Sequence, residues 1–407
     1  MRPAPRLVGE PSLFPTMDDI PAKGSPSKRA ARLFVEELKL TNFRNYERLA
    51  LNLDARPVVL VGDNGAGKTN LLEAVSLLGP GQGLRGRHYS ELARKDGPGG
   101  WAVAARMRSL EGEIEIGTGF GLVPGEEETG RAVRIAGKEQ GSNTLADYVQ
   151  LVWVIPEMDG LFTGPASERR RFLDRLTLAI DPQLRIPRGR FERAMRQRNR
   201  LFQTREGSPA YFAGLEEQMA EAAVAVAAAR LDAVTRLTGL IDGMREERGD
   251  GPFPFAGLGL EGTLENALRE RPAVEVEDDY VSLLSEMRER DRAAGRTLVG
   301  PHLSDLKVMH GPTNAPASDC SSGEQKALLI GLVLAKARLI QALSGATPLV
   351  LLDEVAAHLD EARRMALFGE ILSLGAQAWM TGTDRPIFAS IASQAQILAV
   401  NRGKISA

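Results

Sequence analysis

The run GDNGAGKT, from Gly62 to Thr69, decides the fold class of this chain. It follows a short all-apolar stretch, Val58–Val61, of the kind that is buried on both faces of a parallel sheet. A helical pattern of apolar residues begins just after it, at Leu71. A glycine-rich loop between a buried strand and a helix distinguishes a phosphate-binding P-loop from a chance glycine-rich turn. The pattern therefore predicts an α/β fold built around a nucleotide.

The P-loop predicts that the chain binds ATP together with Mg²⁺. The Lys68 ammonium group is expected to reach the β and γ phosphates, and the Thr69 hydroxyl is expected to bind the metal. A helix that starts at the loop adds a favourable dipole for phosphate. The backbone N–H groups expected around the phosphates belong to Gly62, Asp63, Asn64, Gly65, Ala66 and Gly67.

A second motif places two acids after another buried strand. The apolar residues Leu349–Leu352 lead directly into Asp353 and Glu354. Two acids can simply cap a strand, but beside a P-loop they have a chemical role. We predict that Asp353 belongs to the magnesium shell and that Glu354 is the general base that polarises the attacking water.

A third motif, SSGEQK at Ser321–Lys326, precedes a helical run at Ala327–Leu339. Ser322 and Gly323 can offer a hydroxyl and bare N–H groups to an anion, although serine and glycine before a helix are also common capping residues. The order of the three motifs resembles that of the ABC class of ATPases. In that class the signature loop contacts the γ-phosphate held by the opposing subunit, so the resemblance implies a homodimer that forms with ATP.

The spacing of the motifs predicts a divided domain. We expect an ABC-type P-loop ATPase head in two parts, residues 31–175 and 293–407, with a helical arm inserted between them at residues 176–292. The arm is expected to be a short antiparallel coiled-coil-like lobe with a long helix at Gly214–Met244. Leu33–Leu40 alternates in polarity and predicts an edge strand. Residues 1–30 read as a disordered extension, and Met17 is a second candidate for the translation start.

The bulk composition predicts a cytoplasmic protein. Its net charge of -2 and pI near 6.2 neither demand nor exclude a nucleic-acid partner, since a local basic patch is sufficient. Cys320 is the one cysteine, so no intrachain disulfide can form, which fits a reducing compartment. The sequence contains no uninterrupted apolar run of membrane-spanning length, and the first 30 residues lack the apolar segment of a secretory signal.

Several motifs together resemble the RecF family of bacterial recombination mediator ATPases, and the resemblance extends from about Leu33 to Ser406. The matching segments are LTNFRNY (Leu40–Tyr46), GDNGAGKTNLLEAVSLL (Gly62–Leu78), SERRRFLD (Ser167–Asp174), GPHLSDL (Gly300–Leu306), SSGEQK (Ser321–Lys326), LLDEVAAHLD (Leu351–Asp360) and TGTD (Thr381–Asp384).

The resemblance implies a function in recombinational repair and replication. A member of this family binds DNA at gaps or at junctions between single and double strands, with RecO and RecR as partners, so that RecA loads onto gapped DNA. A link to the SOS response is also implied. Its ATPase is expected to be weak and stimulated by DNA, with hydrolysis resetting the dimer.

An arginine-rich stretch offers a DNA surface at the base of the arm. Such a stretch can neutralise phosphates without reading sequence, but it can equally be a solvated helix face with acidic partners such as Glu168 and Glu192. We predict that Arg193, Arg196 and Arg200 contact DNA. The other members are Arg169, Arg170, Arg171, Arg185, Arg188, Arg190 and Arg198.

Three other classes were compared with this sequence. A transporter ATPase subunit would carry a histidine near Thr383 and only a short insert between the P-loop and Ser321. A long coiled-coil SMC-type protein would need hundreds of heptad residues in the arm. A scaffold with a dead P-loop would not be expected to keep Lys68, Thr69, Asp353 and Glu354 together.

Overall fold

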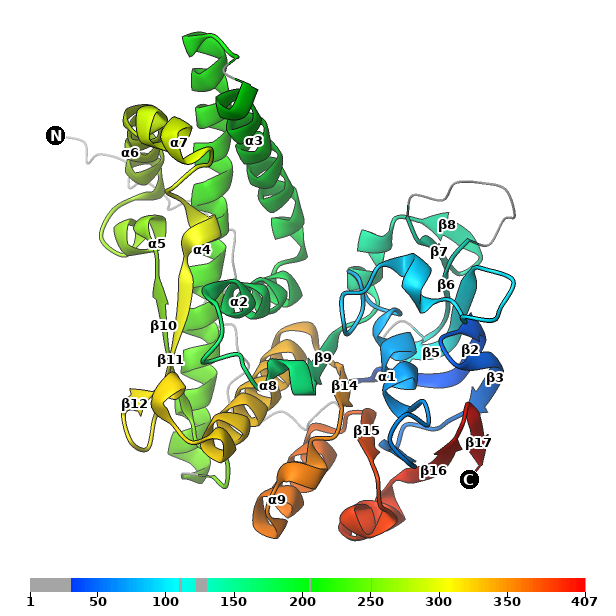
Figure 1. The fold of residues 1–407 in the computed structure, drawn as a ribbon. Coiled ribbons are helices and arrows are strands. Elements are labelled where there is room, and N and C mark those ends of the chain that lie inside the picture. The colour runs from blue at the N-terminus through cyan, green and yellow to red at the C-terminus, as the bar shows by residue number, and fades with distance from the viewer. Residues whose placement is uncertain (1–30, 110–111, 122–129, 205, 250, 407) are drawn as a thin grey trace, which may run out of the picture.

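The computed structural model describes residues 31–109, 112–121, 130–204, 206–249 and 251–406. Figure 1 shows a head that contains both large sheets, and a helical arm that rises beside it. The predicted disordered extension, residues 1–30, lies outside the described residues.

A six-stranded sheet forms the centre of the head and has the order β17-β16-β4-β15-β14-β9. All neighbouring strands are parallel except the pair β16 and β17. In this order β15 lies between β4, which leads into the P-loop, and β14, which leads into Asp353. Both motifs therefore lie at the carboxyl ends of these parallel strands. The strands are β4 (Val58–Val61), β9 (Leu151–Val154), β14 (Leu349–Leu352), β15 (Ala378–Gly382), β16 (Gln396–Asn401) and β17 (Lys404–Ser406).

A second, antiparallel sheet of six strands has the order β3-β2-β5-β6-β7-β8. The prediction of an edge strand at Leu33–Leu40 is wrong, because β2 pairs with β3 on one side and with β5 on the other. Alternating polarity reports one solvated face and does not locate a strand within its sheet. The strands are β2 (Phe34–Phe43), β3 (Tyr46–Asn52), β5 (Trp101–Ser109), β6 (Gly112–Phe120), β7 (Ala132–Ile135) and β8 (Lys138–Gln140).

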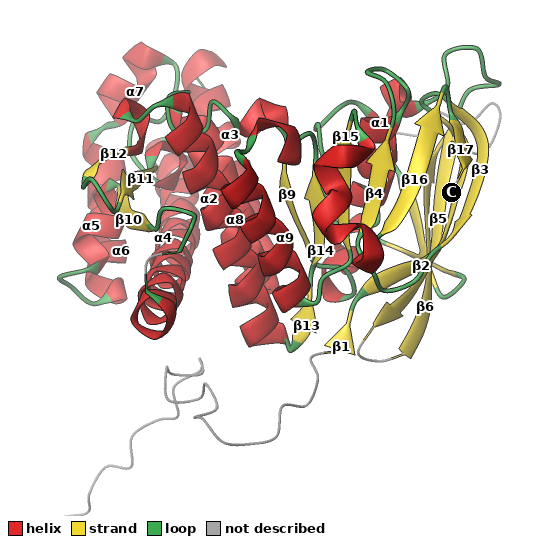
Figure 2. Ribbon diagram, turned by 90° about the horizontal axis from the view of Figure 1, so that it is seen from below, coloured by secondary structure: helices red, strands yellow, loops and turns green. Residues whose placement is uncertain are grey.

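Three helices surround the nucleotide motifs. The helix α1 (Lys68–Ser76) follows the P-loop and is buried along most of its length. The helix α8 (Ser322–Ser344) follows the signature motif, and α9 (Glu361–Leu374) runs beside it on one face of the parallel sheet (Figure 2). A short parallel pair, β1 (Ala31–Arg32) with β13 (Ala346–Thr347), follows the end of α8.

Among the described residues, α8 is the one helix long and apolar enough to cross a membrane by length and composition. Two thirds of its apolar window (67%) is buried inside the protein, so α8 is a core helix of the head.

The arm is built on an antiparallel helix pair, α3 and α4, which lie side by side in Figure 1. The helix α4 has 40 residues, and at 1.5 Å per residue it is about 60 Å long, longer than predicted. The Ser208 hydroxyl accepts a hydrogen bond from the Tyr211 N–H, which starts α4 before Gly214. The arm helices are α2 (Ala166–Ile180), α3 (Arg185–Thr204), α4 (Pro209–Arg248), α5 (Thr263–Leu268), α6 (Ala273–Glu286) and α7 (Arg288–Ala294).

A small sheet returns the chain from the arm to the head. The strand β10 (Ala256–Glu261) lies within the predicted arm, residues 176–292, and pairs antiparallel with β11 (Asp305–His310), which also pairs with β12 (Ala315–Pro316). The predicted boundary between residues 175 and 176 falls inside α2. The division into head and arm by residue number therefore stays a prediction.

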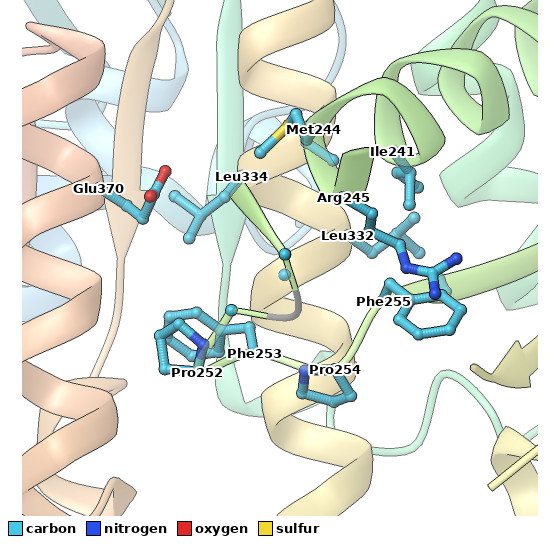
Figure 3. Close-up of a pocket in the computed structure, with 15 residues that line it drawn as sticks. Ile241, Met244, Arg245, Pro252, Phe253, Pro254, Phe255, Leu332, Leu334 and Glu370 are labelled. Atoms are coloured by element: carbon cyan, nitrogen blue, oxygen red, sulfur yellow. The ribbon is translucent and has the colours of Figure 1, made fainter. Parts of the chain in front are cut away.

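The C-terminal end of α4 packs on the head, and an apolar cavity of about 130 Å³ lies between them (Figure 3). Phe253 and Pro254 line the cavity from the loop after α4, and Leu332 lines it from α8. The Arg245 guanidinium lies 3.4 Å from the centroid of the Phe255 ring. Apolar packing thus anchors the arm on the signature helix.

The middle of α8 carries a buried lysine. Lys336 is 4% exposed, and its ammonium group lies 5.6 Å from the Phe172 ring centroid. Burial, together with the nearby charge of Arg175, lowers the pKa of Lys336 to about 7. Because the unfolded chain keeps a pKa near 10.5, folding releases a proton between pH 7 and 10.5, and stability rises with pH across this window.

We expect Lys336→Met to raise the free energy of unfolding by roughly 2–4 kcal/mol at pH 7, because the variant avoids neutralising a buried cation. The gain should be largest below pH 7 and should shrink as pH approaches 10. Urea unfolding at pH 6.5 and pH 9 measures it. Lys138→Met, at an exposed position of β8, is the matched control and should show no such pH dependence. An equal effect of the two variants would contradict the burial argument.

Candidate nucleotide and DNA sites

The P-loop lies at the carboxyl end of the central strand β4. The Gly62 N–H donates to the Gly382 carbonyl at 3.3 Å, which ties the loop to β15. The Lys68 ammonium donates to the carbonyls of Gly62 at 2.6 Å and Asp63 at 2.9 Å. Lys68 is 4% exposed, so its charge is held within the curve of the loop, where the motif predicts phosphate.

Two positions of the loop require glycine, because other atoms of the protein lie too close to leave room for a side chain. A Cβ atom at Gly62 would lie 2.1 Å from the Val400 carbonyl oxygen of β16. Gly67 has φ 116°, and a Cβ there would lie 2.4 Å from Asn45 Nδ2. Any larger residue at either position would push the loop away from its supports.

The turn between β2 and β3 holds the loop from the other sheet. Asn45 Nδ2 donates to the Ala66 carbonyl at 3.1 Å, and the Tyr46 hydroxyl donates to the Gly67 carbonyl at 3.0 Å. The sequence placed Asn45 and Tyr46 in a family motif but gave them no role. Their contact with the loop joins residues that are 21 positions apart.

Hydroxyl groups join Asp353 to the P-loop and the backbone of Glu354 to β15. Thr69 Oγ1 donates to Asp353 Oδ1 at 3.0 Å, and Thr381 Oγ1 donates to the same oxygen at 2.8 Å. The Glu354 N–H donates to Thr381 Oγ1 at 2.8 Å. Thr381 therefore positions both acids, a role that the sequence did not assign to it.

The backbone of Glu354 and the pKa of Asp353 both depart from their ordinary values. Glu354 has φ 55°, in the left-handed region, which costs energy for a residue with a side chain. Burial raises the pKa of Asp353, although the hydrogen bonds from Thr381 and Thr69 lower it. Together, Lys68, Thr69, Asp353 and Glu354 can hold phosphate groups, a divalent cation and a water next to them.

The signature motif forms the start of α8. Ser321 is the N-cap, and its hydroxyl donates to Glu324 Oε2 at 2.6 Å, which lowers the pKa of Glu324. Ser322 and Gly323 occupy the first positions of the helix and are exposed. Within the described residues, no hydrogen bond joins Ser322 or Gly323 to the P-loop of the same chain.

The predicted DNA-binding arginines lie along α3. Arg193, Arg196 and Arg200 are exposed, and Figure 1 shows α3 running from the head toward the end of the arm remote from it. The prediction that this stretch lies at the base of the arm is therefore wrong for Arg200, which is one turn from the end of α3. Arg196 lies 3.8 Å from Glu192, whereas Arg193 and Arg200 make no ion pair with the described residues.

Two other members of the arginine stretch are structural. Arg198 is 0% exposed and bonds to Glu216 at 3.0 Å and Asp291 at 2.5 Å, so counting it as a surface cation was wrong. Arg169 bonds to Asp305 at 2.7 Å and joins α2 to β11. Buried arginines of this kind need their carboxylate partners, and both of these have them.

Comparison with known proteins defines the class of this chain. The family described as RecF/RecN/SMC N terminal domain matches residues 34–406. A solved structure described as the recombination mediator protein RecF-ATPrS in the RecFOR pathway has a TM-score of 0.78 at 22% identity, covering 92% of this chain and 98% of that chain. The fold is therefore that of RecF and SMC heads, an ABC-type ATPase fold.

Other relatives are more similar in sequence to this chain than that solved structure is. The DNA replication and repair protein RecF of Rhizobium leguminosarum bv. trifolii is 52% identical over 375 residues, which cover 92% of this chain and 99% of that protein. The protein of the same name from Brucella suis biovar 1 is 49% identical over 386 residues, 95% of this chain and 99% of that protein. The chain belongs to the RecF family.

Proposed function

We propose that this chain is an ATP-dependent DNA-binding protein of recombinational repair and replication, active in the cytoplasm. It binds gapped or junction DNA as an ATP-induced homodimer and helps RecA loading together with RecO and RecR, with a further link to the SOS response. It is a weak ATPase, stimulated by DNA, and hydrolysis resets the dimer. The names of its relatives, DNA replication and repair protein RecF, support this assignment.

One observation carries the nucleotide part of the proposal: Thr69 Oγ1 lies 3.0 Å from Asp353 Oδ1. Two neighbouring oxygen ligands of an octahedral Mg²⁺, each about 2.1 Å from the metal, are about 3.0 Å apart. These residues therefore fit a magnesium shell with little movement. If Mg²⁺ binds there, Thr69 and Asp353 would hold it, and its charge would offset the negative charge that develops on the phosphates of ATP.

The chain's own groups supply the remaining steps. Lys68 leaves the carbonyls of Gly62 and Asp63 for the phosphates of ATP, an exchange of neutral acceptors for charged ones. The Glu354 carboxylate orients the attacking water and takes its proton. The hydrogen bonds of Thr381 hold Asp353 and Glu354 in position while the phosphates bind.

The start of α8 supports pairing of two heads. Glu324 is occupied in the helix cap, so it does not block Ser322 and Gly323. These exposed residues offer a hydroxyl and free N–H groups at the positive end of a 23-residue helix, the usual site for a phosphate group. In the proposed dimer they bind the γ-phosphate of the ATP held by the partner.

Ser322→Arg is expected to leave ATP binding by the single head intact and to prevent ATP-induced dimerisation. A bulky cation would fill the position of the partner's γ-phosphate. Fluorescent-nucleotide titration measures the first property, and sedimentation velocity with ATP measures the second. Ser285→Arg, at an exposed position of α6 in the arm, is the matched control and should dimerise normally. Normal pairing of Ser322→Arg would refute a site completed by the partner.

The exposed arginines of α3 support the DNA part. Arg193 and Arg200 have no carboxylate within 4.0 Å among the described residues, so their charges are available to phosphates. Pairing two heads would present two such helices on one assembly, and their contacts would act together as a bivalent site. The ATP-bound dimer should therefore bind DNA more tightly than the monomer.

Charge reversal of Arg193, Arg196 and Arg200 together is expected to weaken DNA binding by about tenfold or more at low salt. Binding to every sequence should weaken alike, and the salt dependence should flatten, because these residues contact backbone phosphates. Gel-shift titrations with ATP at several salt concentrations measure both effects, and ATP-induced dimerisation should survive.

The matched control reverses three exposed cations of the head, Lys39, Arg48 and Lys404, and changes the net charge equally. If both triple variants lose the same affinity, the effect is one of overall charge. If the α3 variant binds as well as the unmodified protein, the arginines form a solvated face and the DNA surface lies elsewhere.

A further inference from the structure

A cavity of about 460 Å³ lies where the head meets the arm. Its walls come from the loop after α1 (Pro80–Gly83), from β9, and from the arm helices α2 and α3. The strand β9 pairs with β14 on one side only, so the cavity opens along the free edge of the parallel sheet. The cavity therefore touches the loop that follows α1, the central sheet and the arm.

Three arginines face this cavity. Arg185 donates to the carbonyls of Pro182 and Asn143, and Arg188 bonds to Glu192 at 3.1 Å. Arg175 is different, since it makes no hydrogen bond or ion pair with any described residue. Its guanidinium carbon lies 5.2 Å from the centroid of the Trp153 ring, the contact that holds it. Burial lowers the pKa of Arg175 to about 10.

A second basic side chain, Lys336, lies close to Arg175. Trp153 and Arg175 also line a much smaller void of about 10 Å³, and Lys336 lines that void as well. Lys336 is 4% exposed and, like Arg175, has no hydrogen bond or ion pair within the described residues. The charges of Glu168 and Asp174 act on Arg175, but neither carboxylate bonds to it, so its hydrogen-bond donors can bind an anion.

Much of the remaining lining is apolar, although the carboxylate residue Glu192, the partner of Arg188, lines the cavity as well. Ala146, Val149, Leu151, Leu178 and Ala179 provide a surface suited to a flat, weakly polar group, and the amide side chains of Gln82, Asn143 and Gln150 lie at its border. An apolar cavity of several hundred Å³ with a few convergent polar groups is the usual form of a small-ligand site. The ligand must combine an anion with an apolar or aromatic part.

We propose that this cavity binds one nucleotide unit of a single DNA strand, with its phosphate on Arg175 and Arg188 and its base against Trp153 and the apolar wall. Arginine binds phosphate through two parallel hydrogen bonds, and base stacking on aromatic and guanidinium planes is how proteins hold single strands without reading sequence. A base within a duplex is stacked and paired, so only an unpaired nucleotide can enter an enclosed cavity.

The position of the mouth connects the cavity to the proposed DNA surface, and the inference rests on that proposed function. Gly189 of α3 lines the cavity, and a Cβ added there would lie 3.2 Å from Arg193 Nη1. Arg193 thus lies beside a residue that lines the cavity. Duplex DNA on α3 would place a single strand next to the cavity, which gives a physical basis for preferring a junction.

Tryptophan emission tests the site directly. The chain has three tryptophans; Trp101 and Trp379 are 1% and 0% exposed, whereas Trp153 is half-buried beside the cavity. The full-length protein, with ATP and Mg²⁺ saturating the P-loop, is titrated with a five-nucleotide oligo(dT). We expect quenching of the emission, and Trp153→Phe should remove this change.

Two variants separate occupancy of the cavity from general charge. Arg175→Gln removes the charge without breaking a hydrogen bond to another described residue. It should weaken the oligonucleotide affinity measured by quenching by about tenfold or more, the usual effect of losing one charged hydrogen bond. Gly189→Leu fills the mouth from a helical position where the added Cβ meets only the end of a flexible side chain. It should abolish quenching while duplex binding in gel shifts persists.

The outcomes distinguish a free nucleotide from a single strand as the ligand, and they distinguish failure of this inference from failure of the proposed function. If dTMP quenches as well as the oligonucleotide, the site takes a free nucleotide and the single-strand assignment is wrong. If duplex DNA binds through α3 but no oligonucleotide quenches Trp153, this inference fails and the proposed function stands. If neither duplex nor single strand binds, both are overturned.

Discussion

Lys68→Ala is expected to weaken ATP binding by about two to three orders of magnitude. Among the described residues of the loop, no other cation is placed to neutralise the β and γ phosphates, and each charged hydrogen bond contributes about 1.5–3 kcal/mol. Lys68 bonds in the structure only to the carbonyls of Gly62 and Asp63, so its loss should leave the fold intact. A fluorescent-nucleotide titration with magnesium measures the affinity.

Two variants accompany this test. Lys404→Ala removes an exposed lysine of β17 and should bind ATP normally. Lys68→Arg keeps the charge, but Lys68 is 4% exposed and the larger guanidinium has little room, so its affinity should fall between the two. Unchanged affinity of Lys68→Ala would remove the P-loop assignment.

Glu354→Gln is expected to lower ATP hydrolysis by roughly a hundredfold or more, the usual scale for losing a general base. Glutamine keeps the size and the hydrogen-bonding capacity of the side chain, and the Glu354 N–H still bonds to Thr381. ATP binding should therefore persist and the ATP-bound dimer should accumulate. Steady-state phosphate release, with and without DNA, measures the loss.

The alternative base is Asp384, which follows β15 and accepts a hydrogen bond from Thr383 Oγ1 at 2.9 Å. Asp384→Asn should retain hydrolysis within a few-fold of the unmodified protein. If Glu354→Gln hydrolyses ATP normally while Asp384→Asn does not, the base is Asp384 and the role given to Glu354 is wrong.

The central strands and the P-loop could be predicted because their signals are local. Val58–Val61 and Leu349–Leu352 are strands with the predicted bounds, since four consecutive apolar residues beside a motif leave little freedom. In contrast, the place of β2 within its sheet depends on partners far along the chain.

The supports of the site could not be predicted. Thr381 meets Asp353 across 28 residues, and Asn45 meets Ala66 across 21, so neither contact has a local sequence signature. The first contact requires β15 to lie beside β14, and the second requires the antiparallel sheet to lie against the P-loop. Their roles are geometric, because they position a loop and two acids that the motifs had already identified.

The arginines of α3 illustrate the same limit. Arg196, Arg198 and Arg200 are near neighbours in one helix, yet Arg198 is buried and the other two are exposed. Its partner Asp291 is 93 residues away in sequence, so composition alone could not separate a structural arginine from one that is free to bind phosphate.

The central claim is that a second copy of the chain completes the nucleotide site when ATP is bound. Size-exclusion chromatography with light scattering on the Glu354→Gln protein tests it most directly, without nucleotide and then with ATP and Mg²⁺. We expect the 44.0 kDa mass of one chain without nucleotide and twice that mass with ATP. A mass of one chain at saturating ATP would contradict it.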